Sequence, residues 1–248
     1  MKNNNLTYIW GIPTRIFHWL LVISLVVAYI VEESNLTLHV ALGYMAGILV
    51  LFRLVWGLIG PRYSHFRDFP AGIGSQLEFA RGFGKTGKVY AGHNPPASVV
   101  MLLIMIGVVC VVCTGMLTLA QEGGQGILKS VVLPDYIEFK DIHEASVNVL
   151  IALVIFHLAG ILIDFILHKS NSALKSIFTG YKSGIDSGDS TMNGFQKLFA
   201  FGWIVVPFIA FFLTITGPPV QLNEGEGEGG KTEKNEQGDF GESDEDED

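Results

Sequence analysis

Cysteine is scarce in this chain of 248 residues, which holds only Cys110 and Cys113. Both lie inside an apolar run, which argues against a disulfide framework or a zinc ribbon. Thr114 follows, where covalent haem attachment would need a histidine after Cys-x-x-Cys. A glycine-rich phosphate loop and a soluble catalytic triad are also missing. We interpret the two cysteines as small packing residues of an apolar helix.

Charge is sparse as well, except at the C-terminal end. Charged residues make up 16% of the chain and hydrophobic residues 49%, and the net charge is -8. Residues 224–248 hold twelve acids and two lysines, so they carry about -10 and leave the rest near +2. Their low complexity and near absence of aromatic residues predict a disordered acidic tail over 221–248. The body of the chain has the composition of a membrane protein.

Five apolar runs fill that body. Each approaches the roughly 20 residues that an α-helix needs to cross about 30 Å of hydrocarbon. The predicted transmembrane helices cover residues 16–33, 38–60, 97–120, 143–167 and 197–216. The sequence therefore predicts an all-α protein with a transmembrane four-helix core over 1–182, a linker and fifth transmembrane helix over 183–220, and the tail. A short interfacial helix is predicted around Gly74 to Phe83.

The orientation in the membrane follows from the positions of lysine and arginine. Basic residues gather in the connections between the second and third helices and between the fourth and fifth: Arg62, Arg67, Arg81, Lys85, Lys88, Lys169, Lys175 and Lys182. The opposite connections are acidic or balanced, with Glu32 and Glu33 in the first of them. This pattern predicts a cytoplasmic N-terminus and a C-terminal tail on the outer side.

The seven histidines are the residues with chemistry to explain. Three fall in loops or at a helix end, where a solvated polar side chain is a sufficient interpretation: His65, His93 and His168. Four fall within or at the start of predicted spans: His18, His39, His143 and His157. An ionisable group in a span is costly unless it faces the bundle interior with a partner, so these four indicate a functional site.

The depths of these four histidines sort them into two levels. His18 begins the first helix on the cytoplasmic side, whereas His39 begins the second helix after the chain has crossed. His143 opens the fourth helix on the outer side, and His157 follows 14 residues later, roughly 21 Å deeper and about 40° from the same face. Two imidazole pairs at two depths predict two bis-histidine b-type haems stacked across the membrane, an arrangement that suits electron transfer.

Three neighbouring residues support the haem interpretation less specifically. Arg53 shares the face of His39 at the depth of the inner pair, and Arg15 precedes His18 by one turn, so either arginine would meet a haem propionate. Gly43 would remove bulk where a flat macrocycle approaches the second helix. Each residue also has a plainer interpretation: the arginines as interfacial anchors, the glycine as helix packing, and any one histidine as a helix-end group bonded to a carbonyl.

Four stretches carry a resemblance to a known family: "PTRIFHW" (13–19), "HVALGYMAGILVLFRLVWGLIGPRY" (39–63), "GHNPPA" (92–97), and the helix with His143 and His157. Over residues 8–182 the chain resembles the bacterial cytochrome b561 family, which includes b-type cytochrome subunits of membrane-bound nickel-iron hydrogenases. The resemblance implies a four-helix core that binds two b haems through the four histidines. It also implies the bacterial cytoplasmic membrane as location, with the tail in the periplasm.

The leading functional hypothesis is a transmembrane electron carrier between the quinone pool and a soluble or peripheral redox protein. The partner would be a hydrogenase, a dehydrogenase or a c-type cytochrome, and the acidic tail would steer a cationic partner. As an electron-transfer subunit of an oxidoreductase system, the chain has no predicted catalytic residues. Membrane lipid and quinone are expected partners as well, and nucleic acid is not expected. The alternatives are a quinone oxidoreductase acting on superoxide or oxygen, and an ion transporter that uses the histidines.

Overall fold

The computed structural model describes residues 6–82, 90–168, 172–185 and 188–222. Its five long helices are α1 (Ile12–Val31), α2 (Leu36–Ile59), α4 (Pro95–Gly123), α5 (Phe139–His168) and α7 (Gly194–Thr216). All five are long and apolar enough to cross a membrane. The all-α transmembrane fold is thus confirmed, fifth helix included. The disorder predicted for the tail concerns residues 223–248, which lie outside the described residues, as do Lys85, Lys88 and Lys169.

Local sequence signals place the helix ends. The side chain of Asn35 accepts a hydrogen bond from the Leu38 backbone N–H at the start of α2, and Asn94 does the same for Ala97 at the start of α4. Asn193 and Gln196 form a capping box at the start of α7. The helix α4 ends where Gly124 takes a left-handed conformation with φ of 57°. Each cap satisfies backbone groups that the helix leaves unpaired.

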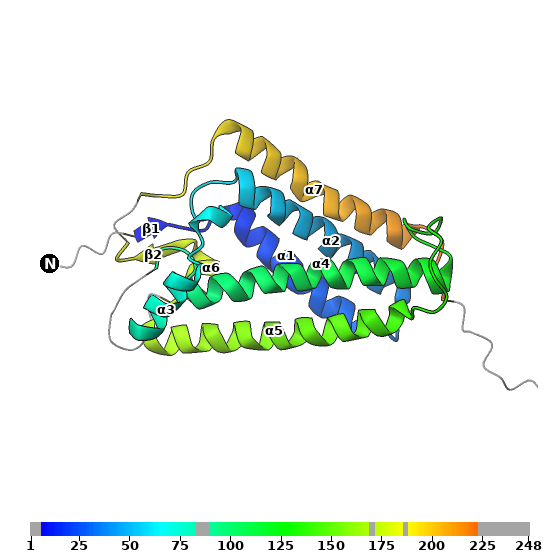
Figure 1. The fold of residues 1–248 in the computed structure, drawn as a ribbon. Coiled ribbons are helices and arrows are strands. Elements are labelled where there is room, and N and C mark those ends of the chain that lie inside the picture. The colour runs from blue at the N-terminus through cyan, green and yellow to red at the C-terminus, as the bar shows by residue number, and fades with distance from the viewer. Residues whose placement is uncertain (1–5, 83–89, 169–171, 186–187, 223–248) are drawn as a thin grey trace, which may run out of the picture.

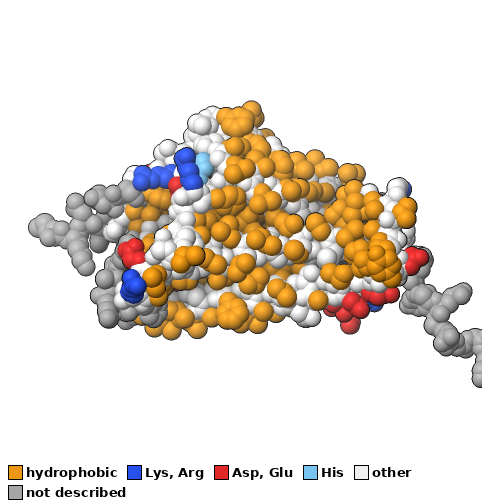
Figure 2. Space-filling model, viewed as in Figure 1, with side chains coloured by type: hydrophobic (Ala, Val, Ile, Leu, Met, Phe, Trp, Pro, Cys, Tyr) orange, Lys and Arg blue, Asp and Glu red, His pale blue; other side chains and the backbone are white. Residues whose placement is uncertain are grey.

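The helices are arranged around α2, which is the most buried of the five spans. It packs against α1, α4 and α7, while α5 packs along α4 (Figure 1). Aromatic rings join α2 to α7: Phe52, Trp56, Phe199 and Trp203 lie with centroids 5.4 to 6.2 Å apart. Figure 2 shows apolar side chains over the middle of the bundle and charged side chains near its two ends, as expected for a membrane-spanning body.

One end of the bundle carries an element that the sequence did not predict. Strand β1 (Leu6–Tyr8) pairs antiparallel with β2 (Tyr181–Ser183), so the chain before α1 is joined to the chain after α5 (Figure 1). We call this the sheet end. The short helices η1 (Phe66–Asp68), α3 (Ile73–Gly82) and α6 (Ala173–Thr179) lie there as well. The helix α3 corresponds to the predicted interfacial helix.

The opposite end, which we call the far end, contains the connections from α1 to α2 and from α4 to α5. The chain after α7 returns to it, because the Val220 N–H donates to Thr37 Oγ1 at 3.0 Å. The root of the C-terminal tail therefore lies beside the start of α2, two residues from His39.

Close packing of α2 on α4 depends on Gly47. A Cβ atom at this position would lie 2.9 Å from Val112 Cγ1. We therefore expect Gly47→Ala to lower the thermal unfolding temperature of the detergent-solubilised protein, with a cost of about 1–3 kcal/mol typical of overpacking. The control is Gly202→Ala on α7, where a Cβ meets nothing within 4 Å. Equal unfolding temperatures for the two variants would contradict this packing role.

Candidate functional site

The far-end histidines lie face to edge across two helices. His39 projects from the first turn of α2 and His143 from the first turn of α5, and their ring centroids are 6.2 Å apart with planes at 87°. His39 Nδ1 lies 2.9 Å from the Ala28 carbonyl oxygen on α1. His143 Nδ1 lies 3.0 Å from the Val111 carbonyl oxygen on α4. The pairing inferred from depth is thus present as a spatial pair.

These two hydrogen bonds determine which ring nitrogens are available. A carbonyl oxygen only accepts, so Nδ1 carries the proton in both His39 and His143 and Nε2 keeps its lone pair. An Nδ1–H bonded to a carbonyl is the usual outer-shell arrangement of a metal-binding histidine. A metal–imidazole bond is about 2 Å long, so rings 6.2 Å apart leave room for an ion between them. The pair fits the axial ligands of a haem iron, whose other four ligands come from the porphyrin.

The second pair lies toward the sheet end. His18 is on α1 and His157 is on α5, and they are close enough for a charge on one ring to act on the other. Both side chains are half-buried. The His18 ring also contacts Trp19 edge-on, with centroids 5.1 Å apart. Among the described residues, α1 and α5 share no extensive backbone contact, so the two histidines lie on helices that are not closely packed together.

The glycines near the histidines divide into two kinds. A Cβ at Gly43, one turn after His39, would meet nothing within 4 Å, and the same holds for Gly160 on α5. Gly47 and Gly115 are packing positions instead, because a Cβ would press on Val112 and on the His143 ring respectively. Gly43 therefore borders open space, as the approach of a macrocycle requires, whereas Gly47 follows the plainer interpretation of helix packing.

The two predicted arginines both lie at the sheet end. Arg53 is only 2% exposed, donates to the Ser64 carbonyl oxygen at 3.2 Å, and has its guanidinium over the Phe66 ring. Arg15 donates to the Phe178 carbonyl oxygen at 2.7 Å, and its buried Nε has no hydrogen-bond partner. A buried guanidinium bound only to a carbonyl is a ready partner for a carboxylate.

The interpretation of His93 as a solvated loop residue is wrong. Its ring lies edge-on to Trp10 and to Phe69, each with centroids 5.0 Å apart, and its buried Nδ1 has no hydrogen-bond partner. Burial, helped by the charges of Arg53 and Lys182, lowers the pKa of His93 to about 3. Its place in "GHNPP" before a helix was a signal, but only tertiary contacts bury it. His65 begins η1, and the His168 side chain lies outside the described residues.

Lys182 is a second site residue that sequence reasoning missed, since it counted there only as a cytoplasmic charge. Its side chain is 7% exposed in β2 and its Nζ donates to the Tyr90 carbonyl oxygen at 2.9 Å. Burial lowers the pKa of Lys182, while the nearby Asp164 carboxylate raises it. A lysine in a three-residue strand gave no sequence signal of burial.

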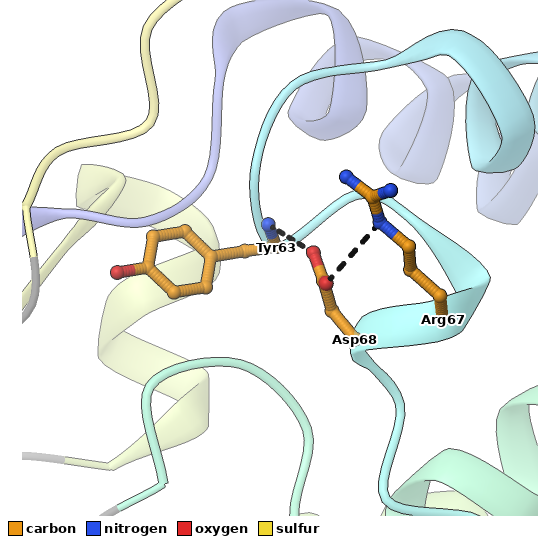
Figure 3. Close-up of polar contacts among 3 residues, drawn as sticks. All are labelled: Tyr63, Arg67 and Asp68. Carbon is orange, nitrogen blue, oxygen red and sulfur yellow. Dashed lines mark hydrogen bonds and ion pairs between the residues drawn. The ribbon is translucent and has the colours of Figure 1, made fainter.

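A cavity of about 330 Å³ opens at the sheet end beside His93. Its lining combines aromatic and polar side chains, among them Arg62, Tyr63, Asp68, Phe69, Tyr90 and His93. Tyr63 has a left-handed backbone with φ of 69°, and its N–H donates to Asp68 Oδ2 at 3.0 Å, while Arg67 lies 3.9 Å from the same carboxylate (Figure 3). The Tyr63 hydroxyl donates to the Gly188 carbonyl oxygen. Two hydrogen bonds made by Tyr63, one through its N–H and one through its hydroxyl, therefore hold this strained residue in the cavity wall.

Comparison with known proteins assigns the family. The model of the family described as prokaryotic cytochrome b561 matches residues 9–180. The chain belongs to that family. It is also 24% identical over 176 residues to a protein from Azotobacter chroococcum mcd 1 named "Probable Ni/Fe-hydrogenase B-type cytochrome subunit", covering 58% of this chain and 73% of that protein. No solved structure matches.

Family membership makes this b561 protein a multi-pass membrane b-type cytochrome that takes part in electron transfer. The match ends at residue 180, so α7 and the acidic tail lie beyond it. The far-end imidazole pair, the open space beside Gly43, and the two arginines that bind carbonyl oxygens are the features of this chain that fit a b-type haem.

The half-buried His93, whose Nδ1 is enclosed, makes stability depend on pH. The unfolded chain binds a proton near the ordinary value of 6.5, whereas the folded chain does so only near 3. Stability is therefore fully present above pH 6.5 and declines as the pH falls toward 3, by up to about 1.4 kcal/mol per pH unit from this group. We expect His93→Gln to flatten that decline in thermal unfolding measured from pH 7.5 to 4.5, while His65→Gln does not. Parallel curves for wild type and His93→Gln would contradict the burial of a neutral imidazole.

Proposed function

We propose that this b561 cytochrome holds two b haems, one between His39 and His143 and the other between His18 and His157. The observation that supports this most strongly is the far-end pair, with centroids 6.2 Å apart and both Nδ1 atoms engaged by carbonyls. Arg53 and Arg15 would meet propionates at the sheet end, and Gly43 would give the far-end macrocycle room. When bound, the haems supply one-electron redox chemistry within the bundle.

The protein residues orient and insulate that chemistry. The Ala28 and Val111 carbonyls hold the rings of His39 and His143 in one tautomer and raise the basicity of Nε2. Thr114 Oγ1, 3.2 Å from His143 Nδ1, supports the same ring. The four histidines would hold the haems between apolar helices, and two protein ligands for each iron would favour electron transfer over oxygen chemistry.

The proposed orientation places the sheet end in the cytoplasm and the far end in the periplasm of a bacterial inner membrane. Exposed basic side chains gather at the sheet end: Arg62, Arg67, Arg81 and Lys175. The connection from α4 to α5 and the first turn of α5 are more acidic than basic, with Asp135, Glu138 and Asp141 exposed beside Lys129 and Lys140. The positive-inside rule supports this assignment.

Quinone exchange is proposed at the sheet-end cavity. Oxidation of a quinol to a quinone releases two electrons and two protons, so the site needs an electron path to a haem and groups that take protons. The cavity offers aromatic walls for a flat ring and polar groups for its oxygens. His93 lies between this cavity and the region of His18 and His157, whose charges both act on it. Its unpartnered Nδ1 is a candidate hydrogen-bond acceptor for a quinol hydroxyl.

The proposed electron partner docks at the far end. The relative from Azotobacter chroococcum mcd 1 is named as a probable hydrogenase cytochrome subunit, which supports a hydrogenase or a comparable redox protein as partner. The exposed acids of the far end and the acidic composition of residues 224–248 favour a partner with a basic docking face, such as a c-type cytochrome. The same charges oppose an anionic substrate such as superoxide.

The ligand assignment is tested by haem content. We expect His39→Ala and His143→Ala each to reduce two haems per chain to one and to remove the same redox transition. His18→Ala and His157→Ala should each remove the other transition, because an iron that loses one axial imidazole loses its bis-histidine spectrum. The measurements are haem per chain and redox titration of the reduced-minus-oxidised spectrum, with His65→Ala as control. Loss of one transition by both His18→Ala and His39→Ala would overturn the pairing.

The quinone site is tested by filling the cavity. A Cβ at Gly92 would have its nearest neighbour, Trp10, at 3.7 Å, so a leucine starts without a clash and extends into the cavity. We expect Gly92→Leu to lower kcat/KM for haem reduction by a quinol by on the order of tenfold, about 1.4 kcal/mol, with an unchanged haem spectrum. Gly74→Leu on α3, where a Cβ meets nothing within 4 Å, is the control. Wild-type quinol kinetics in Gly92→Leu would rule this cavity out.

A further inference from the structure

Lys182 is a buried cation without an obvious reason for its burial. It lies opposite Thr7 in the β1–β2 pair, and its side chain is 7% exposed. The hydrogen bond from its Nζ to the Tyr90 carbonyl oxygen, at 2.9 Å, uses one of three donors. Burying an ammonium group costs several kcal/mol unless a negative charge compensates. Among the described carboxylates, Asp164 is the one that acts on Lys182, and a second anion would complete the compensation.

Contacts and charges around Lys182 connect it to His93 and to the sheet-end histidine pair. Tyr90, whose carbonyl Lys182 binds, precedes His93 by three residues. The Phe69 ring contacts His93 at 5.0 Å and lies 5.7 Å from the Arg53 guanidinium carbon. Charges on Lys182 and Arg53 both act on His93, and so do charges on the two ligand candidates of this level, His18 and His157. Lys182 and Arg53 therefore converge on one region beside the proposed sheet-end haem.

The charges in this region do not balance among the described side chains. Arg53 and Arg15 bind only carbonyl oxygens, and neither forms an ion pair with a described carboxylate. Asp164, two turns beyond His157 on α5, is the acid that acts on Lys182. Lys182, Arg53 and Asp164 together carry about +1, and Arg15 adds a positive charge at the same end of the bundle. A b haem carries two propionate carboxylates, which supply the missing charge.

We propose that Lys182 binds a propionate of the haem held by His18 and His157, and that the β1–β2 pair places it there. Lys182 is thus a positioning residue that completes the cationic set of Arg53 and Arg15. The inference rests on the proposed function, because it requires a haem at the sheet-end pair. Residue 182 lies two positions beyond the part of the chain that the family model matches.

A cation at this position has a consequence that a purely structural side chain lacks. Oxidised haem iron carries one more positive charge than reduced iron, so a nearby ammonium disfavours the oxidised form. Lys182 therefore raises the midpoint potential of the sheet-end haem. Asp164, of opposite charge and on the same side, lowers it.

The experiment is a redox titration of the purified, haem-loaded full-length protein. Lys182→Met keeps the length of the side chain and removes the charge, Lys182→Arg keeps the charge, and Lys175→Met removes an exposed charge from α6 as control. We expect Lys182→Met to shift one of two midpoint potentials downward, and Lys182→Arg and Lys175→Met to leave both near the wild-type values. Asp164→Asn should shift the same transition upward, a change of opposite sign that poor folding does not produce.

Two ligand-deleted backgrounds identify which haem responds. With His39→Ala, where the sheet-end haem remains, Lys182→Met should still lower the midpoint potential. With His157→Ala, where the far-end haem remains, it should have no effect. Unchanged potentials in Lys182→Met, or equal shifts of both haems, would overturn the inference while leaving two haems and the proposed function intact. A purified wild-type protein without haem would overturn both. If Lys182→Met does not fold, Lys182→Gln and the upward shift in Asp164→Asn decide the same question.

Discussion

The hydrogen bonds from two imidazoles to helix carbonyls are the constraint on which the proposed site depends. A histidine inside a lipid-spanning bundle must find a polar partner, and most backbone carbonyls of a helix are already engaged. His39 reaches the Ala28 carbonyl across to α1, and His143 reaches the Val111 carbonyl across to α4. Each hydrogen bond joins two neighbouring helices and leaves the Nε2 atom of its histidine free. The same two contacts therefore orient the rings and tie α2 to α1 and α5 to α4.

The four helices that carry or contact the histidines are arranged as two pairs. The helices α1 and α2 pack as one pair and α4 and α5 as another, with α2 in contact with α4 through Gly47. The histidines of each level come from opposite pairs, His39 with His143 and His18 with His157. A cofactor held between the pairs would add contacts where the described helices share few. The helix α7 closes the outer face of α2 with an aromatic cluster and stands apart from the histidines.

The sheet end contains several groups that are costly to bury or strained. A strained Tyr63 held by Asp68, the cavity beside His93 and the buried Lys182 lie in the segments that cover the ends of the helices, and the buried Arg53 lies in α2 next to them. Groups of this kind are costly to bury and persist where the surrounding structure compensates them. Because these groups lie at one end, they support the proposal that substrate and proton chemistry takes place at the sheet end. The electron partner would then dock at the far end.

Hydropathy in the sequence was sufficient for the five spans, and helical rise predicted the two levels of histidines, because both patterns act within single helices. They also singled out Arg53, Arg15 and Gly43. They could not show that His93 and Lys182 are buried, because both residues follow loops and are enclosed only by contacts with distant segments. Trp10 covers His93, and β1 pairs with the strand that carries Lys182 more than 170 residues away. Burial of a loop residue depends on such long-range pairing, so the cavity and the cation beside it emerged only from the folded chain.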